Sequence, residues 1–507
     1  MCRVHNKRTS PEVIALLLRN LLPATRTQFS GTDDVEITGI EYDSRTVGPG
    51  DLFVAVPSVG GDPETGGHRF IPMAIQRGAA AIVFESGEPP AGVASARVAS
   101  ARRALADLAA SFYGHPSASL NLFGVTGTDG KTTTTYLAEQ IFSIAGFKTG
   151  LIGTVETRIG NERLPNDERV TTPESADVQK LLRSMRDAGV THVAIEASSH
   201  ALALERLRGC RFAACALTNI AADHLEFHGS WEAYFAAKAR LFTEFASDRP
   251  AILNGDDEHF DALQAQIRHD PLTYSLSRES WLHATNLRPM ELGTRFDMIC
   301  SGRCAQVELR LPGRFNASNA LAAAGLALAA GVDLKEVARG LSSAAPPPGR
   351  SQQIDAGQAF RVLIDYAHTV NAFRSLLSAL RDLLGEGGRL IAVFGAAGNR
   401  DRGKRPVLAE IAMKYTDYFY VTNEDPCDED PHQIMAEILS GVPSEDAGRR
   451  FELQPDRETA IRLACQRAGA SDTVVILGKG HERSIVAGGR KLPWSDEDVT
   501  RRILSAL

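Results

Sequence analysis

The stretch GVTGTDGKTTTTYL, at residues 124–137, decides the fold of the middle of the chain. The largely apolar segment 120–125 is typical of a buried strand, and YLAEQIF, at 136–142, is typical of a helix. Glycines between the two let the backbone turn tightly, so that its N–H groups and the N-terminus of the helix face an anion. The sequence therefore predicts a strand, a phosphate-binding loop and a helix.

Two side chains of this loop carry the chemistry of a nucleotide site. Lys131 supplies a point charge for the terminal phosphates, and the hydroxyl of Thr132 is placed to reach Mg²⁺. The match is to the second half of GxxxxGK[ST], because the first glycine stands at 124 and not at 125. ATP with Mg²⁺ is the expected ligand, and the other expected contacts in the loop are Gly127, Thr128, Asp129, Gly130 and Thr133.

The composition is that of a large globular enzyme. The chain has 507 residues, 43% of them hydrophobic and 23% charged, and a net charge of −7, so about three domains are expected and nucleic acid is not an expected partner. No apolar stretch is long enough to insert into a membrane, and the first residues lack the apolar core of a signal peptide, which predicts a cytoplasmic protein. The seven cysteines are scattered, which favours free thiols.

Alternating strand and helix patterns divide the chain into three α/β blocks. We predict a Rossmann-like domain at 1–118, a central P-loop ATPase-type domain at 119–345 and a second Rossmann-like domain at 346–507. The segment APPPGR, at 345–350, is a plausible hinge before the third block. In the second block, Glu196 ends an apolar strand and His224 lies in an acid- and histidine-rich loop, so both are candidates for a metal site. Lys238, taken alone, reads as a surface lysine on a helix.

Taken together, the motifs resemble the Mur ligases, ATP-dependent enzymes of peptidoglycan synthesis that form amide bonds. The resemblance is greatest to the branch that adds the third amino acid to UDP-N-acetylmuramoyl-L-alanyl-D-glutamate. Nearly the whole chain is covered, in the expected order and with the family's own spacing of the loop glycines. The matching segments are DSRTVGPGDLFVA from Asp43, the phosphate loop, TTP from Thr171, EASSHAL from Glu196, TNIAADHLEFHG from Thr218, AAK ending at Lys238, LPGRFNASNALAA from Leu311, DYAHT from Asp365, FGAAGNRDRGKRP from Phe394 and GKGHE from Gly478.

The resemblance implies a role at each matching position. ATP and Mg²⁺ would be held by Lys131, Thr132, Glu196 and His224, and the adenosine or phosphates by Asn316, Arg350, Asp365 and His368. The lysine that matches Lys238 is carbamylated in the family, which would make it a carboxylate able to bind a second Mg²⁺. Substrate contacts would be Ser44 for the uridine nucleotide, Thr171, Thr172, Ser198 and Arg206 for the muramoyl-dipeptide, and Arg400, Asp425, Gly478 and Glu482 for the amino acid.

The implied reaction has two steps. The D-glutamate carboxylate attacks the γ-phosphate of ATP to give an acyl phosphate and ADP, with Mg²⁺ and Lys131 cancelling the repulsion between the two anions. The amine of the incoming amino acid then attacks the acyl carbon and releases phosphate. Because water would destroy the acyl phosphate, closure of the C-terminal domain over the site is expected.

The amino acid is predicted from a departure from the family pattern. Members that add meso-diaminopimelate carry DNPR, whereas this chain reads TNEDPCDEDP, with Cys427 in place of the arginine that binds the distal carboxylate. Glu424, Asp425, Glu429 and Glu482 would add a negative field suited to a side-chain ammonium. L-Lysine or L-ornithine is therefore the predicted substrate, and meso-diaminopimelate is the alternative if another basic residue replaces the missing arginine.

Three other classes of protein stay open on the sequence. A folylpolyglutamate synthase shares the phosphate loop and the acyl-phosphate route, although DSRTVGPGDLFVA favours a domain for a uridine nucleotide. A P-loop kinase or NTPase would stop at phosphoryl transfer. A catalytically silent binding homologue is disfavoured by the presence of Lys131, Glu196, His224 and Lys238.

Overall fold

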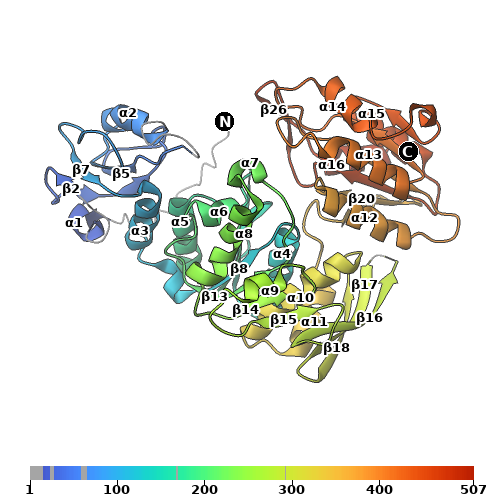
Figure 1. The fold of residues 1–507 in the computed structure, drawn as a ribbon, viewed down its shortest axis with the longest axis horizontal. Coiled ribbons are helices and arrows are strands. Elements are labelled where there is room, and N and C mark those ends of the chain that lie inside the picture. Colours follow the sequence, from blue (N-terminus) through green and yellow to red (C-terminus); the bar gives the residue numbers. More distant parts are fainter. Residues whose placement is uncertain (1–14, 23–27, 59–65, 167–168, 292) are drawn as a thin grey trace.

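A computed structural model describes residues 15–22, 28–58, 66–166, 169–291 and 293–507. Its strands form three principal sheets that follow one another along the chain, with helices packed against each (Figure 1). The predicted architecture of three α/β bodies is confirmed.

The N-terminal sheet has five strands, parallel except for the first. In spatial order they are β2 (Gln28–Ser30), β7 (Ala94–Arg97), β6 (Ala81–Phe84), β5 (Asp51–Val54) and β4 (Gly39–Glu41). Helix α3 (Ala101–Phe112) packs on one face and α2 (Ile71–Gln76) on the other, so both faces are buried. Two short strands, β1 (Leu16–Leu17) and β3 (Glu36–Ile37), form a separate antiparallel pair, and α1 (Leu18–Leu21) follows β1 directly.

The central sheet has eleven strands, parallel in the middle and antiparallel at both ends. In spatial order they are β11 (Glu162–Pro165), β10 (Glu156–Ile159), β9 (Thr149–Ile152), β12 (His192–Glu196), β8 (Asn121–Thr126), β13 (Phe212–Leu217), β14 (Ala251–Asn254), β15 (Leu272–Ser275), β16 (Leu282–Met290), β17 (Gly293–Cys300) and β18 (Arg303–Leu309). The long antiparallel extension β16–β18 was not anticipated from the sequence.

Helices cover both faces of the central sheet. One face carries α4 (Lys131–Ile144), α10 (Arg314–Ala329) and α11 (Leu334–Ser343). The other carries α5 (Ser175–Asp187), α6 (Ser199–Ala203) and α8 (Trp231–Arg240), and the shorter α7 (Leu225–His228) and α9 (Phe260–Gln264) lie in connecting segments. Because β8 lies between β12 and β13, their carboxyl ends meet beside the phosphate loop.

The C-terminal sheet has six strands, all parallel except the first pair. In spatial order they are β19 (Gln352–Gln353), β20 (Arg361–Asp365), β24 (Thr473–Leu477), β21 (Leu390–Phe394), β22 (Tyr418–Val421) and β23 (Phe451–Leu453). Helices α12 (Val370–Asp382), α13 (Lys404–Tyr415) and α14 (Pro431–Leu439) cover one face, and α15 (Arg457–Arg467) and α16 (Asp496–Leu504) the other. A hairpin, β25 (Ser484–Ala487) and β26 (Arg490–Pro493), follows β24.

Continuous apolar strands account for this burial. In β21, Leu390, Ala392 and Phe394 point into one core, and Ile391 and Val393 point into the other. A parallel strand covered on both faces needs apolar side chains at every position, and β21 meets that requirement.

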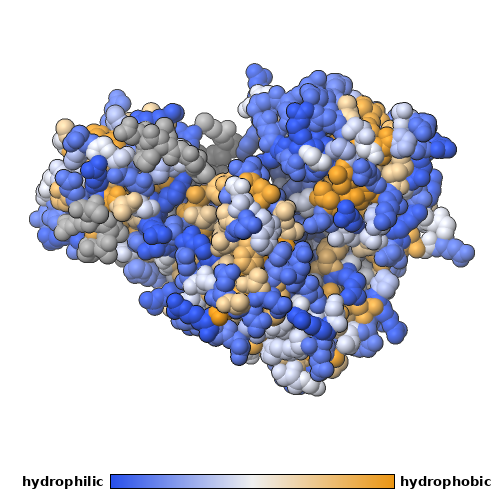
Figure 2. All heavy atoms as spheres, viewed as in Figure 1, coloured by the Kyte–Doolittle hydropathy of each residue, from blue (hydrophilic) through white to orange (hydrophobic). Residues whose placement is uncertain are grey.

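The surface agrees with the polar composition. On the face seen in Figure 2, hydrophilic residues predominate and apolar residues gather only in small patches. Among the described residues, no helix is long and apolar enough to cross a membrane. The six cysteines within the described ranges are free thiols, as the scattered spacing predicts.

Candidate active site

The phosphate loop joins the end of β8 to the start of α4. Gly127 and Gly130 have φ values of 147° and 85°, which side chains other than glycine rarely adopt. A Cβ at Gly130 would lie 2.2 Å from the Asn319 side-chain oxygen, so the glycine is needed for packing as well. Lys131 Nζ donates to the carbonyl oxygens of Gly127 and Thr128, at 2.9 Å each. The lysine therefore lies over the loop where terminal phosphates would bind.

Oxygen atoms gather beside this lysine. Thr132 Oγ1 donates to Glu196 Oε2 at 3.0 Å, and Glu196 Oε1 accepts from the backbone N–H of Thr154 at 2.8 Å. The hydroxyl of Thr154 lies 3.0 Å from Glu196 Oε2 and 3.1 Å from Thr171 Oγ1. Hydroxyl and carboxylate oxygens are the ligands that Mg²⁺ prefers, so the donors present fit this ion.

In the described part of the chain, no three His, Cys, Asp or Glu side chains are grouped so that they could hold a metal ion. This agrees with a nucleotide site, because Mg²⁺ is usually held there by one or two protein oxygens together with the phosphates and water. Thr132 and Glu196 are the pair that could supply those oxygens.

Lys238 is buried, and the surface position expected of a lone helical lysine is wrong. Its side chain lies within α8 and is 2% exposed. Its Nζ donates to the Gly127 carbonyl oxygen at 2.7 Å and lies 4.6 Å from the centre of the Tyr234 ring. Burial, and then the charge of Lys131, lowers the pKa of this amine well below its usual value. The lysine amine therefore reaches the phosphate loop in surroundings that favour its neutral form.

A cavity of about 240 Å³ opens beside the loop, between the central and C-terminal sheets. Its lining includes six of the residues predicted to contact the nucleotide: Asp129, Gly130, Thr133, Asn316, Arg350 and Asp365. The Arg350 guanidinium stacks on the Tyr366 ring, 4.6 Å from its centre, and Asp365 accepts from the backbone of Ser351 at 2.6 Å. His368 is not part of this lining, and its Nδ1 lies 2.8 Å from the Tyr366 carbonyl oxygen.

The residues predicted to bind the muramoyl-dipeptide form one cluster. Thr172 Oγ1 donates to the Glu196 carbonyl oxygen at 2.6 Å and lies 3.3 Å from Ser198 Oγ. Arg206 Nη1 donates to the Thr172 carbonyl oxygen at 3.0 Å, and its Nε lies 3.3 Å from Glu174 Oε2. The threonine segment is therefore fixed to the strand that carries Glu196.

Two predicted residues lie apart from these clusters. Ser44 is buried in the N-terminal domain, where its hydroxyl lies 3.5 Å from Met73 Sδ. His224 adopts a left-handed backbone with φ 53° and lies 3.5 Å from both Asp223 and Glu226. Its ring packs edge-on against His200, whose pKa is lowered to about 4 by burial and by the charge of His224. The structure therefore places His224 next to a second histidine, in the loop after β13, and not among the hydrogen bonds described for the Thr132–Glu196 pair.

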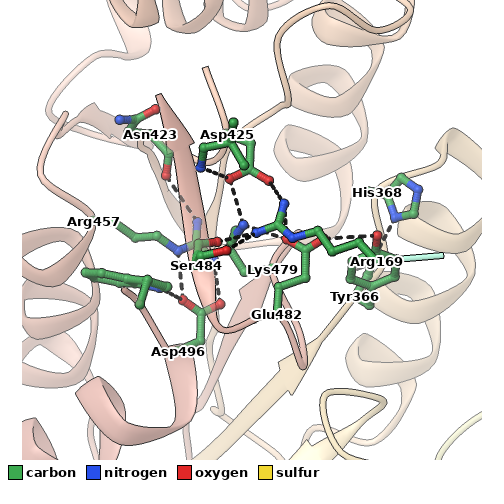
Figure 3. A network of polar contacts seen from close by, with 12 residues as sticks. Arg169, Tyr366, His368, Asn423, Asp425, Arg457, Lys479, Glu482, Ser484 and Asp496 are labelled. Carbon is green, nitrogen blue, oxygen red and sulfur yellow. Dashed lines mark hydrogen bonds and ion pairs between the residues drawn. The ribbon is translucent and has the colours of Figure 1, made fainter. Parts of the chain in front are cut away.

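An interlocked set of charges marks the predicted amino-acid site (Figure 3). Lys479 is fully buried, and its Nζ binds Asp425 Oδ1 at 2.8 Å and Glu482 Oε2 at 2.5 Å. Arg169, from the central domain, binds Asp425 Oδ2 at 2.7 Å and lies 3.4 Å from Glu482 Oε2. Burial favours the neutral acid, but Lys479 outweighs it and holds the pKa of Asp425 below its usual value.

These contacts correct the expected negative field. Asp425 and Glu482 are offset by Lys479 and Arg169. Glu429 binds the buried Arg405 through both oxygens, at 2.9 and 3.0 Å. The sequence shows three of these acids close together, at 424, 425 and 429, but the cations that bind Asp425 and Glu429 come from other segments of the chain.

Glu424 is the fourth acid, and it differs from the others. It is buried, its Oε2 has no hydrogen-bond partner within the described structure, and burial raises its pKa to about 7. A Cβ on Gly478, whose φ is 100°, would lie 2.2 Å from this oxygen. Gly478 therefore gives Glu424 its space at the end of β24.

Arg400 and Cys427 lie around the same site. Arg400 is exposed on the loop after β21, and the neighbouring Asn399 donates its N–H to Glu429 Oε1 at 2.6 Å. Cys427 is partly buried, with a left-handed φ of 54°, and burial followed by Asp425 raises the pKa of its thiol against the opposing charges of Arg400 and Arg169. Both guanidinium groups thus lie within electrostatic range of the position that lacks an arginine.

Three residues of the site were not assigned from the sequence. Lys479 lies inside the quoted GKGHE segment, so the motif carried the signal for it. Arg169 stands two positions before the TTP segment, and Thr154 lies in a loop without a motif. Only the fold shows that these two reach the acids of the site.

A phosphate loop and a Thr–Glu oxygen pair, in a chain with two flanking α/β domains, are the features of an ATP- and Mg²⁺-dependent ligase that forms amide bonds. Three family models match in chain order: "Mur ligase family, catalytic domain" at 36–113, "Mur ligase middle domain" at 125–327 and "Mur ligase, glutamate ligase domain" at 349–480. The chain belongs to the Mur ligase family.

Curated relatives and a solved structure extend this assignment over the whole chain. A UDP-N-acetylmuramyl-tripeptide synthetase of Roseiflexus sp. is 44% identical, over 93% of this chain and 95% of the relative. A UDP-N-acetylmuramoyl-L-alanyl-D-glutamate--2,6-diaminopimelate ligase of Solibacter usitatus is 40% identical, over 92% and 94%. A solved structure with the latter enzyme name superimposes with a TM-score of 0.70 and 30% identity, over 97% of this chain and 99% of that one. The predicted resemblance is confirmed.

Proposed function

We propose that the protein adds a basic diamino acid, L-lysine or L-ornithine, to UDP-N-acetylmuramoyl-L-alanyl-D-glutamate while ATP is converted to ADP and phosphate. One observation carries the proposal: a continuous chain of contacts runs from Thr171 through Thr154 and Glu196 to Thr132. A substrate carboxylate bound at the threonine segment would therefore lie beside the terminal phosphate of ATP. In this scheme, residues 1–118 hold the uridine nucleotide, 119–345 hold ATP, and 346–507 supply the amino-acid site.

The residues of the chain supply the charge that the first step needs. Lys131 already lies against the loop carbonyls, so it can move onto the transferring phosphoryl group without a change in the fold. Bound Mg²⁺, held by Thr132 and Glu196, supplies the Lewis acidity that offsets repulsion between carboxylate and phosphate. Glu196 is held in place by both the N–H and the hydroxyl of Thr154.

We assign Lys238 as a carbamate in the active enzyme. The neutral amine adds to CO₂, which forms a nitrogen–carbon bond and releases one proton. A buried amine whose pKa lies well below its usual value is suited to this addition, because burial and the charge of Lys131 favour the neutral form, which is the nucleophile. The resulting carboxylate would place an oxygen ligand next to Gly127 and the phosphate loop, where the amine now lies.

The choice of a basic amino acid rests on Cys427 and Glu424. Cys427 cannot form the paired hydrogen bonds that an arginine makes with a distal carboxylate. Glu424 Oε2 lacks a partner, and a side-chain ammonium could satisfy it and shift the carboxyl towards its ionised form. Arg400 would bind the α-carboxylate of the incoming amino acid.

meso-Diaminopimelate is the second candidate. Several relatives at 35–40% identity carry the name of the diaminopimelate-adding ligase, and Arg169 and Lys479 bring two cations into the site. Either could contact a distal carboxylate if the ion pairs rearranged. Against this, both cations are already bound to Asp425 and Glu482.

The deciding experiment measures kcat/KM for L-lysine, L-ornithine and meso-diaminopimelate with the same UDP-muramoyl-dipeptide. A preference for lysine or ornithine supports the proposal, and a clear preference for meso-diaminopimelate overturns the assignment of the amino acid. ADP release that needs no amino acid would indicate an NTPase, and no release at all would indicate a silent homologue. We place the reaction in the cytoplasm, with UDP-linked and amino-acid substrates as its small-molecule partners.

A further inference from the structure

Arg169 links the central domain to the C-terminal domain. It lies just after β11, and its two terminal nitrogens contact acceptors of the C-terminal domain. Nη1 donates to Asp425 Oδ2 at 2.7 Å and approaches Glu482, while Nη2 donates to the backbone and side-chain oxygens of Ser484, the latter at 2.8 Å. Figure 3 shows the guanidinium pointing into the set of C-terminal side chains.

The backbone at Arg169 is also unusual. Its φ of 57° lies in the left-handed region, which costs energy for a long side chain unless surrounding contacts compensate. Asn166 braces the same loop, because its Nδ2 donates to the carbonyl oxygens of Gly153 and Val170, at 3.1 and 2.7 Å. Strained residues held by such contacts are common where a protein clamps a ligand or fixes two parts together.

The position of Arg169 connects the two substrate sites. Two residues later, Thr171 begins the threonine segment, which contacts Thr154 and through it Glu196. On the other side, Asp425 Oδ1 accepts from the backbone N–H of Val486 at 2.7 Å, so the carboxylate that binds Arg169 also holds the β25–β26 hairpin. The guanidinium therefore joins the dipeptide segment directly to the amino-acid site.

The two carboxylates Asp425 and Glu482 are balanced by two cations, Lys479 and Arg169. Asp425 and Glu482 are 9% exposed in their side chains, Lys479 is fully buried and Arg169 is 24% exposed. With both cations present, the two carboxylates are offset. Without Arg169, one buried negative charge would lose its partner, and the two domains would lose their shared ion pairs.

We propose that Arg169 is a positioning residue that fastens the C-terminal domain to the threonine segment and so sets the distance between the acyl phosphate and the incoming amine. The proposal rests on the proposed ligase function. Formation of the acyl phosphate uses Lys131, Thr132 and Glu196 of the central domain, so it should continue without Arg169. Capture of the acyl group by the amine should fail more often, and water should hydrolyse the intermediate instead.

The test compares Arg169→Met, which keeps much of the volume and removes the charge, with Arg169→Lys. Arg163→Met is the matched control, because Arg163 is exposed on the neighbouring strand β11. ADP and tripeptide are measured in parallel. For Arg169→Met we expect the KM of the amino acid to rise about tenfold or more and the ratio of ADP to tripeptide to exceed that of the wild type. Arg169→Lys should be intermediate, and the control should match the wild type.

Ser484→Ala is a second variant that removes an acceptor from the other domain. It should shift the ratio of ADP to tripeptide in the same direction by less, and it should add little in the Arg169→Met background, because both changes break the same contact. An unchanged KM and ratio in Arg169→Met would overturn the proposal. A lowered KM would also overturn it, since Arg169 would then compete with the substrate ammonium for the acids.

Small-angle X-ray scattering separates this proposal from the proposed function. The radius of gyration of Arg169→Met should exceed that of wild type and Arg163→Met, because the ion pairs between the two domains are lost. If the wild type forms no tripeptide with any of the three amino acids, the proposed function fails and scattering alone decides the role of Arg169. Equal radii would then refute the link between the domains.

Discussion

Replacing Lys238 by alanine tests the most particular feature of the site. The change removes about three buried methylene groups, worth roughly 2 kcal/mol of apolar burial at about 0.8 kcal/mol each. It also removes a buried amine whose contacts are the Gly127 carbonyl oxygen and the Tyr234 ring, and losing that desolvated group offsets part of the cost. The net change in unfolding free energy should therefore stay within about 2 kcal/mol, and the variant should fold.

Activity should fall much further than stability. If the carbamate of Lys238 binds metal at the transferring phosphoryl group, its loss should reduce kcat about 100-fold or more, because such charge stabilisation is worth several kcal/mol. Short carboxylates such as formate should restore part of the rate by filling the space left beside Gly127. Removing dissolved CO₂ and bicarbonate should lower wild-type activity reversibly.

Lys414→Ala is the matched control, since Lys414 also lies over a tyrosine ring, 5.0 Å from the centre of Tyr415, but on a helix of the C-terminal domain. It should leave the rate unchanged. Near-normal kcat in Lys238→Ala, together with an intact mass that shows an unmodified lysine in the wild type, would refute the carbamate.

Three further predictions follow from single contacts. Lys131→Ala should abolish tripeptide formation while the melting temperature stays close to that of wild type, and normal turnover would contradict the ATP site. Glu424→Gln should stabilise the protein at pH 8 and not at pH 4. Folding raises the pKa of Glu424 from 4.5 to about 7, so the unfolding free energy of the wild type should fall by up to about 3 kcal/mol as the pH rises between these values. Thermal melts across that range measure this fall, and a flat profile would show that Glu424 is not protonated in the folded protein. Arg457→Met should cost about 3–5 kcal/mol in denaturant unfolding, because it leaves the buried Asp496 carboxylate unpaired, and a loss below 1 kcal/mol would show that this pair is not important for stability.

Local sequence patterns were sufficient to predict the elements whose causes are local. Glycines at 127 and 130 are required by the left-handed turns of the phosphate loop, and the residues around them define the strand before it and the helix after it. Strands that read as continuous apolar runs, such as 390–394, are indeed buried on both faces. The family motifs then predicted the order of the three α/β bodies and most of the residues that the structure brings around the phosphate loop and the C-terminal acids.

Tertiary structure alone decided the charge of the amino-acid site. Glu424, Asp425, Glu429 and Glu482 suggested a negative field, but Arg169 reaches Asp425 across 256 positions of the chain. Likewise Lys238 has a pattern typical of a surface helix, and only the packing of α8 against the phosphate loop buries it. Local patterns record which face of an element is apolar; they do not record which distant charge will lie against it, because that depends on how separate sheets and loops come together.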